Sequence, residues 1–404
     1  MRRLLTSAAV PASRGPDLDS IETNSKDITV NSQLPRRDFL KTTAVAGAAL
    51  AAAPARLFAA DAPQLTLAFL GCAHIHTPSF IDLLKRRPEV RVKTVWDHDA
   101  TRAGQRAAQL GAQATTNLKD VLDDPEVKAV VICSETNRHP ALIAGAARAK
   151  KHLFAEKPLG ITGKESYAMA AEIEKAGRLF TTGYFMRTDP KHLFLKEQIA
   201  SGAFGKLTRL SAWNVHSGSL GGWFDDKPDD IANNWRWMAD PKQSGVGAFG
   251  DLGTHSLDIL MWLMGDVESA TADIKVVTGR YGDCDEMGQG LIRFENGVNA
   301  TLTAGWVDIA NPITLLIAGT EGQAWILNDQ LYFLSRKVDG ANGKEPWTKL
   351  PAAPPLPLNQ FVNAVEGQTG QPLVTPHEAA ARVAAMEAMY KGCQESKWVK
   401  PVHG

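Results

Sequence analysis

The stretch Leu153-Phe154-Ala155-Glu156-Lys157-Pro158-Leu159-Gly160 organises this chain. Its first three residues are apolar and predict a short buried strand. Pro158 has no N–H to give to a sheet ladder, so we expect the strand to end before it. Glu156 and Lys157 would then lie at the carboxyl edge of a parallel sheet, where ligands bind in open α/β folds. An isolated Glu-Lys-Pro also suits a surface turn, so its meaning depends on the rest of the chain.

Strands and helices alternate around this stretch. The predicted strands are residues 65–70, 90–96, 128–133, 153–155 and 179–183, and the predicted helices are 77–87, 100–110, 139–149 and 163–176. Such alternation predicts a parallel, doubly wound α/β sheet. We therefore expect residues 63–185 to form one domain of this kind.

The turn after the first strand reads Gly71-Cys72-Ala73-His74-Ile75-His76. A dinucleotide-binding Rossmann domain prefers G-x-G-x-x-G at this place, and only the first glycine is present. Asp97 ends the second strand, where an acid can bind a ribose 2′-hydroxyl. An acid there repels a 2′-phosphate, so NAD is favoured over NADP. A loop carboxylate without such a role is the alternative interpretation of Asp97.

Residues 186–404 have a different pattern. Consecutive extended runs at 267–277, 287–294, 298–306, 313–318 and 323–327 predict a large open, mainly antiparallel sheet in an α+β domain, and a last helix is expected at about 376–394. A long loop at 216–246 contains Trp223, Trp235 and Trp237. Loops this long are usually functional or disordered, and the tryptophans argue against disorder. They can hold a sugar ring or simply pack the loop down.

The predicted helix at 248–264 carries Asp251, His255 and Asp258. Residues four apart lie on one helical face, so Asp251 and His255 are expected side by side. A carboxylate beside a histidine orients the ring for acid/base chemistry, although a purely structural pair is equally compatible with the spacing.

Composition limits the function further. The chain has 404 residues with 44 basic and 44 acidic side chains, so it has no charge excess that would indicate a nucleic-acid partner. Its four cysteines have no CxxC spacing, and we expect no metal site. Residues 1–62 combine a polar, disordered-looking start with Arg36-Arg37 before an apolar run that is too short for a stable membrane anchor. This resembles a twin-arginine signal, which exports folded proteins and places the mature chain in the periplasm.

Taken in order, these motifs resemble the Gfo/Idh/MocA oxidoreductases, the glucose–fructose oxidoreductase and inositol dehydrogenase group. The resemblance covers about residues 64–400. It rests on Glu156-Lys157-Pro158, Asn137-Arg138-His139-Pro140, Gly183-Tyr184 with Arg187, and Asp251-x-x-x-His255. Ala73 and His76 depart from the family's glycine-rich turn.

The resemblance implies an NAD(P)-dependent enzyme that moves a hydride to or from a secondary hydroxyl of a sugar or cyclitol. It implies Lys157 at the reacting oxygen, His255 as acid/base and Asp251 assisting. The expected coenzyme contacts are Gly71, Ala73, His74, Ile75, Asp97, Ser134, Thr136, Asn137, His139, Glu156, Lys157 and Pro158. The expected substrate contacts are Lys157, Tyr184, Arg187, Trp235, Arg236, Asp251 and His255. The resemblance also implies a homodimer or homotetramer. A tightly held NAD is expected as well, because free NAD is scarce outside the cytoplasm.

Two other functions are compatible with the same residues. A redox-assisted glycosidase or lyase would oxidise a sugar carbon transiently and reduce it again after bond cleavage. A non-catalytic dinucleotide- or sugar-binding protein would keep the fold without turnover.

Overall fold

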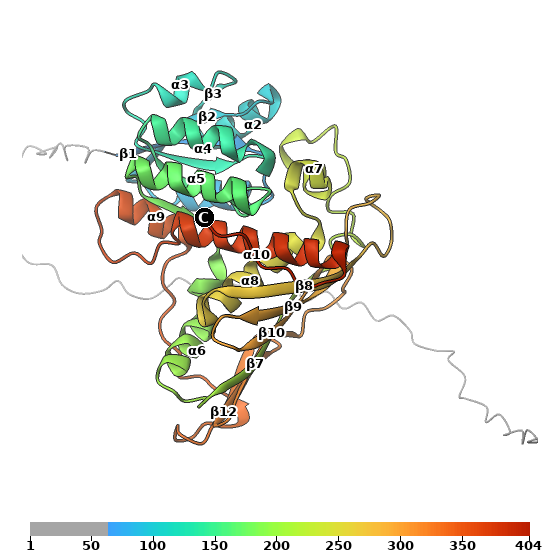
Figure 1. Cartoon of the computed structure of the whole chain (residues 1–404). Coiled ribbons are helices and arrows are strands. Elements are labelled where there is room, and N and C mark those ends of the chain that lie inside the picture. The colour runs from blue at the N-terminus through green and yellow to red at the C-terminus, as the bar shows by residue number, and fades with distance from the viewer. Residues whose placement is uncertain (1–63) are drawn as a thin grey trace, which may run out of the picture. The chain divides into compact units, whose positions relative to one another are not determined.

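The computed structural model describes residues 64–404 (Figure 1). The expectations for residues 1–62 lie outside the described residues. Within the described part, no helix has both the length and the apolar character needed to cross a membrane.

The first sheet has six parallel strands in the order β3-β2-β1-β4-β5-β6. They are β1 (Leu65–Cys72), β2 (Val90–Trp96), β3 (Gln113–Thr115), β4 (Ala129–Cys133), β5 (His152–Ala155) and β6 (Phe180–Thr182). All five residues of β4 are buried, as expected for a strand covered on both faces. The predicted doubly wound sheet is therefore confirmed, with the short edge strand β3 as an addition.

The helices of this part connect the parallel strands. They are α1 (Thr77–Lys85), α2 (Ala100–Leu110), α3 (Lys119–Leu122), α4 (His139–Arg148) and α5 (Gly163–Ala176). Asp99 caps α2 by accepting a hydrogen bond from Arg102 N–H, and Thr162 caps α5 in the same way. The 3₁₀ turns η1 (Thr136–Arg138) and η2 (Phe185–Thr188) follow β4 and β6.

The second sheet has eight strands in the order β14-β13-β12-β11-β7-β10-β9-β8. They are β7 (Leu207–Val215), β8 (Val267–Lys275), β9 (Met287–Phe294), β10 (Asn299–Gly305), β11 (Ile313–Gly319), β12 (Gly322–Leu327), β13 (Gln330–Ser335) and β14 (Asn342–Pro346). The described pairs are antiparallel except β7 with β10, so the mainly antiparallel sheet is confirmed.

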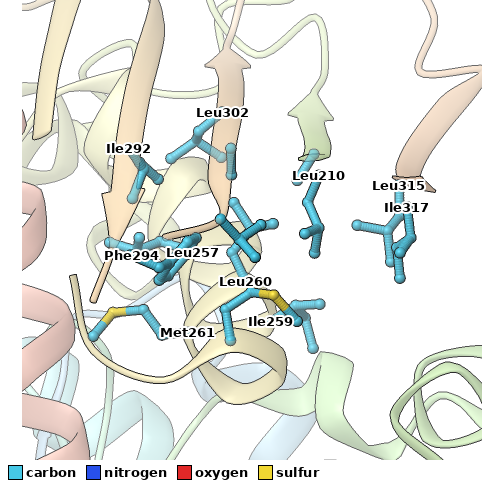
Figure 2. Packing of buried hydrophobic residues seen from close by; sticks show 14 of the residues in the cluster. Leu210, Leu257, Ile259, Leu260, Met261, Ile292, Phe294, Leu302, Leu315 and Ile317 are labelled. Atoms are coloured by element: carbon cyan, nitrogen blue, oxygen red, sulfur yellow. The ribbon is translucent and has the colours of Figure 1, made fainter. Parts of the chain in front are cut away.

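One face of this sheet is covered by α8 (Ala248–Met264). Figure 2 shows Leu257 and Leu260 of α8 directed at the strands, near Leu302 of β10. Fourteen of the seventeen α8 residues are buried. A helix buried on nearly all sides is a rigid support for side chains that it carries.

The remaining helices all follow β6 in the sequence. They are α6 (Pro190–Ala200), α7 (Pro241–Ser244), α9 (Pro357–Val365) and α10 (Pro376–Glu395), with the 3₁₀ turns η3 (Ile231–Asn233) and η4 (Arg236–Ala239). The predicted last helix is confirmed, and Thr375 and Glu378 form the capping box at its start. Figure 1 shows α10 between α5 and β8.

The division of the chain into two domains at residues 185 and 186 stays a prediction. Helix α9 belongs to the second part of the sequence but packs with the first domain. This helix follows the second sheet in sequence but packs on the first, where the Phe361 ring lies 6.1 Å from the ring of Phe154. Sequence periodicity did not indicate α9, because its apolar residues follow the proline-rich segment 351–357 directly.

Candidate active site

Glu156 and Lys157 lie directly after β5, at the carboxyl edge of the first sheet. The Glu156 side chain is fully buried. Its carboxylate accepts hydrogen bonds from the Lys157 backbone N–H at 2.8 Å and from His76 Nδ1 at 3.0 Å. Burial opposes ionisation, but His74, His76 and Lys157 outweigh it and hold the pKa of Glu156 below its ordinary value. Glu156 is therefore a buried, ionised carboxylate that holds the backbone of Lys157 and the ring of His76 at the end of β5.

Lys157 connects the first sheet to α8. Its Nζ lies 2.7 Å from Asp251 Oδ1 and 3.2 Å from the Asp251 carbonyl oxygen. The second oxygen of Asp251 accepts a hydrogen bond from Trp306 Nε1 at 3.2 Å. Burial alone would raise the pKa of Asp251, but Lys157 overcomes this effect and lowers the pKa to about 2. At neutral pH the Lys157 head group thus contacts a carboxylate.

His255 lies one helical turn after Asp251 and is buried. Tyr184 and Phe185 pack on its ring at centroid distances of 6.2 and 4.8 Å. Its Nδ1 has no hydrogen-bond partner among residues 64–404. Burial, with smaller contributions from Lys157 and His76, lowers the pKa of His255 well below 6.5. The neutral ring at pH 7 can accept a proton.

This arrangement provides two chemical capabilities in one place. A neutral imidazole can remove a proton from a hydroxyl group, and a lysine head group can stabilise the negative charge that develops on the oxygen. The two side chains come from different domains, since Lys157 follows β5 and His255 belongs to α8. A substrate that contacts both must lie between the two domains.

Phe185, which packs on His255, also lines two pockets, although His255 itself lines neither of them. One pocket has a volume of about 400 Å³ and is lined by His76, Phe80, Phe154, Gly183, Phe185 and Leu358, among others. The other has a volume of about 350 Å³ and is lined by Phe185, Lys191, Trp213, Ser256, Ile259 and Asp329, among others. Both are large enough for part of a small polar ligand.

The turn that would hold a dinucleotide has the required backbone. Gly71 has φ +85°, and a Cβ at this residue would lie 2.4 Å from Ser134 Cβ, so only glycine fits the close approach of β1 and β4. Ser134 and Thr136 follow β4 at the same edge and are buried. Asn137 is exposed, and His139 Nδ1 hydrogen-bonds with the Leu159 carbonyl at 3.1 Å. The turn and the strand ends thus fit a dinucleotide in backbone geometry.

Asp97 is placed differently from the expectation that it binds a ribose. It is fully buried, and Arg102 donates to both of its oxygens at 2.8 Å. The backbone N–H groups of Cys72 and Asp99 donate to the same carboxylate at 2.8 and 2.9 Å. All acceptor directions of Asp97 are therefore used by the protein, and this carboxylate joins the turn to α2. Sequence spacing identified its position correctly but not its partner Arg102.

The loop at residues 216–246, called here the covering loop, lies over the turn. Trp237 Nε1 donates to the Ala73 carbonyl at 3.0 Å, and Ala73 packs with Trp237, Met238 and Phe224. Ala73 is only 1% exposed. The covering loop therefore closes the turn at Ala73, and a dinucleotide enters or leaves this turn only while the loop is open.

Arg106 of α2 holds the covering loop from the other side. Its Nη2 donates to the Ala232 carbonyl at 2.6 Å and to Asn233 Oδ1 at 2.8 Å. Gln105 Oε1 accepts from the Ala232 N–H at 3.1 Å. The covering loop is thus attached to the first domain at two places, the turn and α2.

Of the other expected substrate contacts, Tyr184 lies beside His255, whereas Trp235 and Arg236 lie in the covering loop. Tyr184 lies beside His255, and its hydroxyl hydrogen-bonds with Thr254 Oγ1 at 3.1 Å. Trp235 belongs to the covering loop, and its buried Nε1 has no partner in the described part of the chain. Arg236 donates to the Ala239 carbonyl at 2.9 Å and stabilises η4. Tyr184 is therefore the member of this set nearest the proposed acid/base.

Arg187, another expected substrate contact, pairs with carboxylates of the protein. Its guanidinium makes a bidentate pair with Asp258, at 2.9 and 2.6 Å, and contacts Glu378 at 3.0 Å. Arg382 contacts the same Asp258 at 2.9 Å. These ion pairs join η2, α8 and α10 through Arg187, and its role as a substrate contact stays a prediction.

Three residues of the site were not identified as such from the sequence. Trp306 holds Asp251, and His76 contacts Glu156. His216 packs on the half-exposed Trp223 at a centroid distance of 4.6 Å, and burial lowers the pKa of His216, against a raising effect of Asp251. The only sequence signal was the departure of His76 from a glycine-rich turn.

Comparison with known families agrees with this geometry. A family model described as "Oxidoreductase family, NAD-binding Rossmann fold" matches residues 65–184, and one described as "GFO/IDH/MocA C-terminal domain" matches residues 192–325. The chain belongs to the Gfo/Idh/MocA family. Its first domain is an NAD-binding Rossmann domain of the kind found in oxidoreductases of this family. A model for the twin-arginine translocation pathway signal sequence matches residues 33–53, which points to export across a membrane.

Characterised Gfo/Idh/MocA relatives include two sugar or cyclitol dehydrogenases. The levoglucosan dehydrogenase of Pseudarthrobacter phenanthrenivorans is 28% identical over 257 residues, which cover 57% of this chain and 63% of the relative. The scyllo-inositol 2-dehydrogenase (NAD(+)) of Bacillus subtilis is 27% identical over 270 residues, which cover 65% of this chain and 74% of the relative. The matched part thus spans less than two thirds of the first of these proteins.

Solved structures of the family share the fold. The levoglucosan dehydrogenase complex with NADH and levoglucosan has a TM-score of 0.67 at 20% identity, covering 84% of this chain and 99% of that chain. The WlbA dehydrogenase of Bordetella pertussis, in complex with NADH and UDP-GlcNAcA, has a TM-score of 0.68 at 17% identity, covering 84% of this chain and 100% of that chain. At these identities the likeness concerns the fold.

Proposed function

We propose that this chain is an NAD-dependent dehydrogenase that transfers a hydride between a nicotinamide and a secondary hydroxyl or ketone of a sugar or cyclitol. The observation that carries the proposal is the 2.7 Å contact between Lys157 and Asp251 beside the buried, neutral His255. Named relatives that act on levoglucosan and on inositols support the substrate class.

The residue roles follow from the geometry. Lys157 binds the reacting oxygen and stabilises its negative charge, while Asp251 and Trp306 hold the lysine in place. His255 takes the hydroxyl proton in oxidation and returns it in reduction. Bound NAD supplies the hydride acceptor. We propose that the Gly71 turn, Ser134 and Thr136 line the coenzyme, with Glu156 fixing the segment that carries Lys157.

The covering loop bears on how the coenzyme is held. Because Trp237 and Arg106 keep the loop on the first domain, NAD bound beneath it would exchange slowly. We propose a tightly held NAD in a periplasmic enzyme that works as a homodimer or homotetramer.

The test of this function uses protein purified from the periplasm. We would denature it and identify any released dinucleotide by mass and absorbance. About one NAD per chain supports the proposal, and a panel of sugars and cyclitols then identifies the substrate. If the protein contains no dinucleotide and binds no added NAD, the dehydrogenase proposal is wrong, and a binding protein on this fold remains.

The covering loop also favours a second candidate, a redox-assisted glycosidase or lyase. A coenzyme that exchanges slowly is best suited to a reaction in which it is reduced and reoxidised within one turnover. The same Lys157 and His255 would serve that reaction. The panel separates the two, since net NADH formation indicates a dehydrogenase, whereas bond cleavage without NADH formation indicates the second candidate.

A further inference from the structure

His76 occupies the place of the third glycine in the dinucleotide-binding turn, directly before α1. A glycine there would have no side chain, whereas His76 extends toward the active site. Its Nδ1 lies 3.0 Å from Glu156 Oε1, and its ring centroid lies 6.4 Å from that of His255. The departure from the turn pattern thus adds a second imidazole beside the proposed acid/base.

His255 needs an outlet for protons. In oxidation it receives one proton for every substrate molecule, yet its side chain is only 3% exposed. The charged groups around it are also buried, since Lys157, Asp251 and Glu156 are 3%, 8% and 0% exposed. His76 differs from all of these, because its side chain is 32% exposed and lines the pocket of about 400 Å³.

The hydrogen bonds of His76 define which nitrogen is available. Its Nδ1–H donates to the Glu156 carboxylate, so the neutral ring has a free lone pair on Nε2. A buried carboxylate on one nitrogen stabilises the imidazolium that forms when the other nitrogen takes a proton. Nδ1 of His76 is therefore held on Glu156, and Nε2 is left free at the side of the ring that has no partner in the described part of the chain.

We propose that His76 relays protons between His255 and solvent, an inference that rests on the proposed function. In oxidation the substrate O–H bond breaks and its proton goes to His255, while the C–H electron pair leaves as hydride to the nicotinamide. The His255 proton then passes through a bridging water to His76 Nε2 and from there to water in the pocket. Reduction uses the same path in reverse. His76 acts through His255 and does not contact the reacting atoms.

The same side chains could instead bind a metal ion, since His74, His76 and Glu156 bring ligand atoms within 4.8 Å of one another. The hydrogen bonds indicate that these side chains carry protons and do not coordinate a metal ion. The His76 backbone N–H donates to His74 Nδ1 at 3.2 Å, which places the single proton of neutral His74 on Nε2, the nitrogen 3.9 Å from Glu156 Oε2. Burial lowers the pKa of His74 to about 3, so this ring is neutral and is not the relay.

The first experiment needs no substrate. Histidine-labelled full-length protein is titrated by nitrogen-15 NMR as wild type, as His76→Gln and as the exposed control His403→Gln. His76→Gln keeps a hydrogen-bond donor for Glu156 but cannot carry a proton. We expect exchange of the His255 ring proton with water to slow about tenfold or more in His76→Gln and to be unchanged in His403→Gln. Unchanged exchange in both variants would overturn the relay.

The second experiment uses turnover, with myo-inositol and levoglucosan as probes and NAD⁺ as acceptor. In His76→Gly, oxidation should fall at low buffer concentration with little change in KM, and added imidazole should restore it. A purely structural role would give no rescue. If the wild type oxidises neither these probes nor any other member of the sugar and cyclitol panel, the proposed function fails while the NMR result still decides the relay. If the wild type is active and His76→Gly needs no buffer, only the relay is wrong.

Discussion

Lys157, which follows a strand of the first domain, places its ammonium 2.7 Å from the carboxylate of Asp251 on helix α8 of the second domain. Both side chains are largely buried, so this contact is not an exposed ion pair of small value. It fixes the distance between the two domains at the point where the substrate is proposed to react. A substrate hydroxyl that binds Lys157 must share the ammonium with Asp251.

Lys157→Ala should reduce turnover by about 100-fold or more, because it removes the charge that stabilises the reacting oxygen. The exposed Lys164→Ala on α5 is the matched control and should retain full activity. Steady-state kinetics and dinucleotide content are measured for both. Near-normal activity of Lys157→Ala with NAD bound would place the site elsewhere.

His255 predicts the pH dependence of the reaction. Its pKa is lowered well below 6.5, so the neutral base is fully present at pH 7 and above and is lost as the pH falls through that lowered pKa. Oxidation should therefore be constant from neutral pH upward and decline only in acid, while reduction, which needs the protonated ring, should slow as the pH rises. His255→Gln should lower the rate by about 100-fold or more and remove the acid limb. An unchanged profile in that variant would exclude His255 as the acid/base.

The covering loop predicts slow coenzyme exchange. Trp237→Phe removes the N–H that binds the Ala73 carbonyl while keeping an aromatic ring, and Arg106→Met removes the contacts to Ala232 and Asn233. Each should accelerate NADH release, by about tenfold for Arg106→Met, since hydrogen bonds to charged groups are worth about 1.5–3 kcal/mol. Release is followed by NADH fluorescence after dilution. Equal release from wild type and both variants would show that the loop does not retain the coenzyme.

Replacing Arg187 should reduce the stability of the fold without a specific loss of substrate binding. Arg187→Met leaves the fully buried Asp258 with Arg382 as its remaining cation and should lower the free energy of unfolding by about 1.5–3 kcal/mol. Arg148→Met, on the exposed end of α4, should be neutral. Urea unfolding measures both variants. A raised KM with unchanged stability would instead make Arg187 a substrate contact.

Local sequence patterns predicted the supporting elements of the site well. The Glu156-Lys157-Pro158 stretch follows a buried strand, and the four-residue spacing of Asp251 and His255 places both on one helix, because strand ends and helical faces are set by neighbours in the chain. The partners of these residues were less accessible. Trp306 lies 55 positions after Asp251, and no periodicity encodes such a pairing.

The same limit applies to the intramolecular partners of Asp97 and Arg187. Asp97 and Arg187 stand where the family pattern places ligand contacts, yet each is occupied by another charged side chain of this protein. Sequence reasoning recognises a charged residue at a strand or helix end but cannot show which opposite charge reaches it. The covering loop was predicted as functional from its length and tryptophans, while its attachment to Ala73 and Arg106 depends on the assembled domains.

The packing of α9 on the first sheet has a consequence for the order in which the protein is made. Leu358, Phe361 and Val362 complete the apolar layer around Phe154, although they are synthesised some 200 residues later. The first domain therefore lacks part of its core until residues 357–365 have been synthesised. Segments some 200 residues apart in the chain must therefore meet before the core of the first domain is closed, so the folding of that domain depends on the chain that follows it.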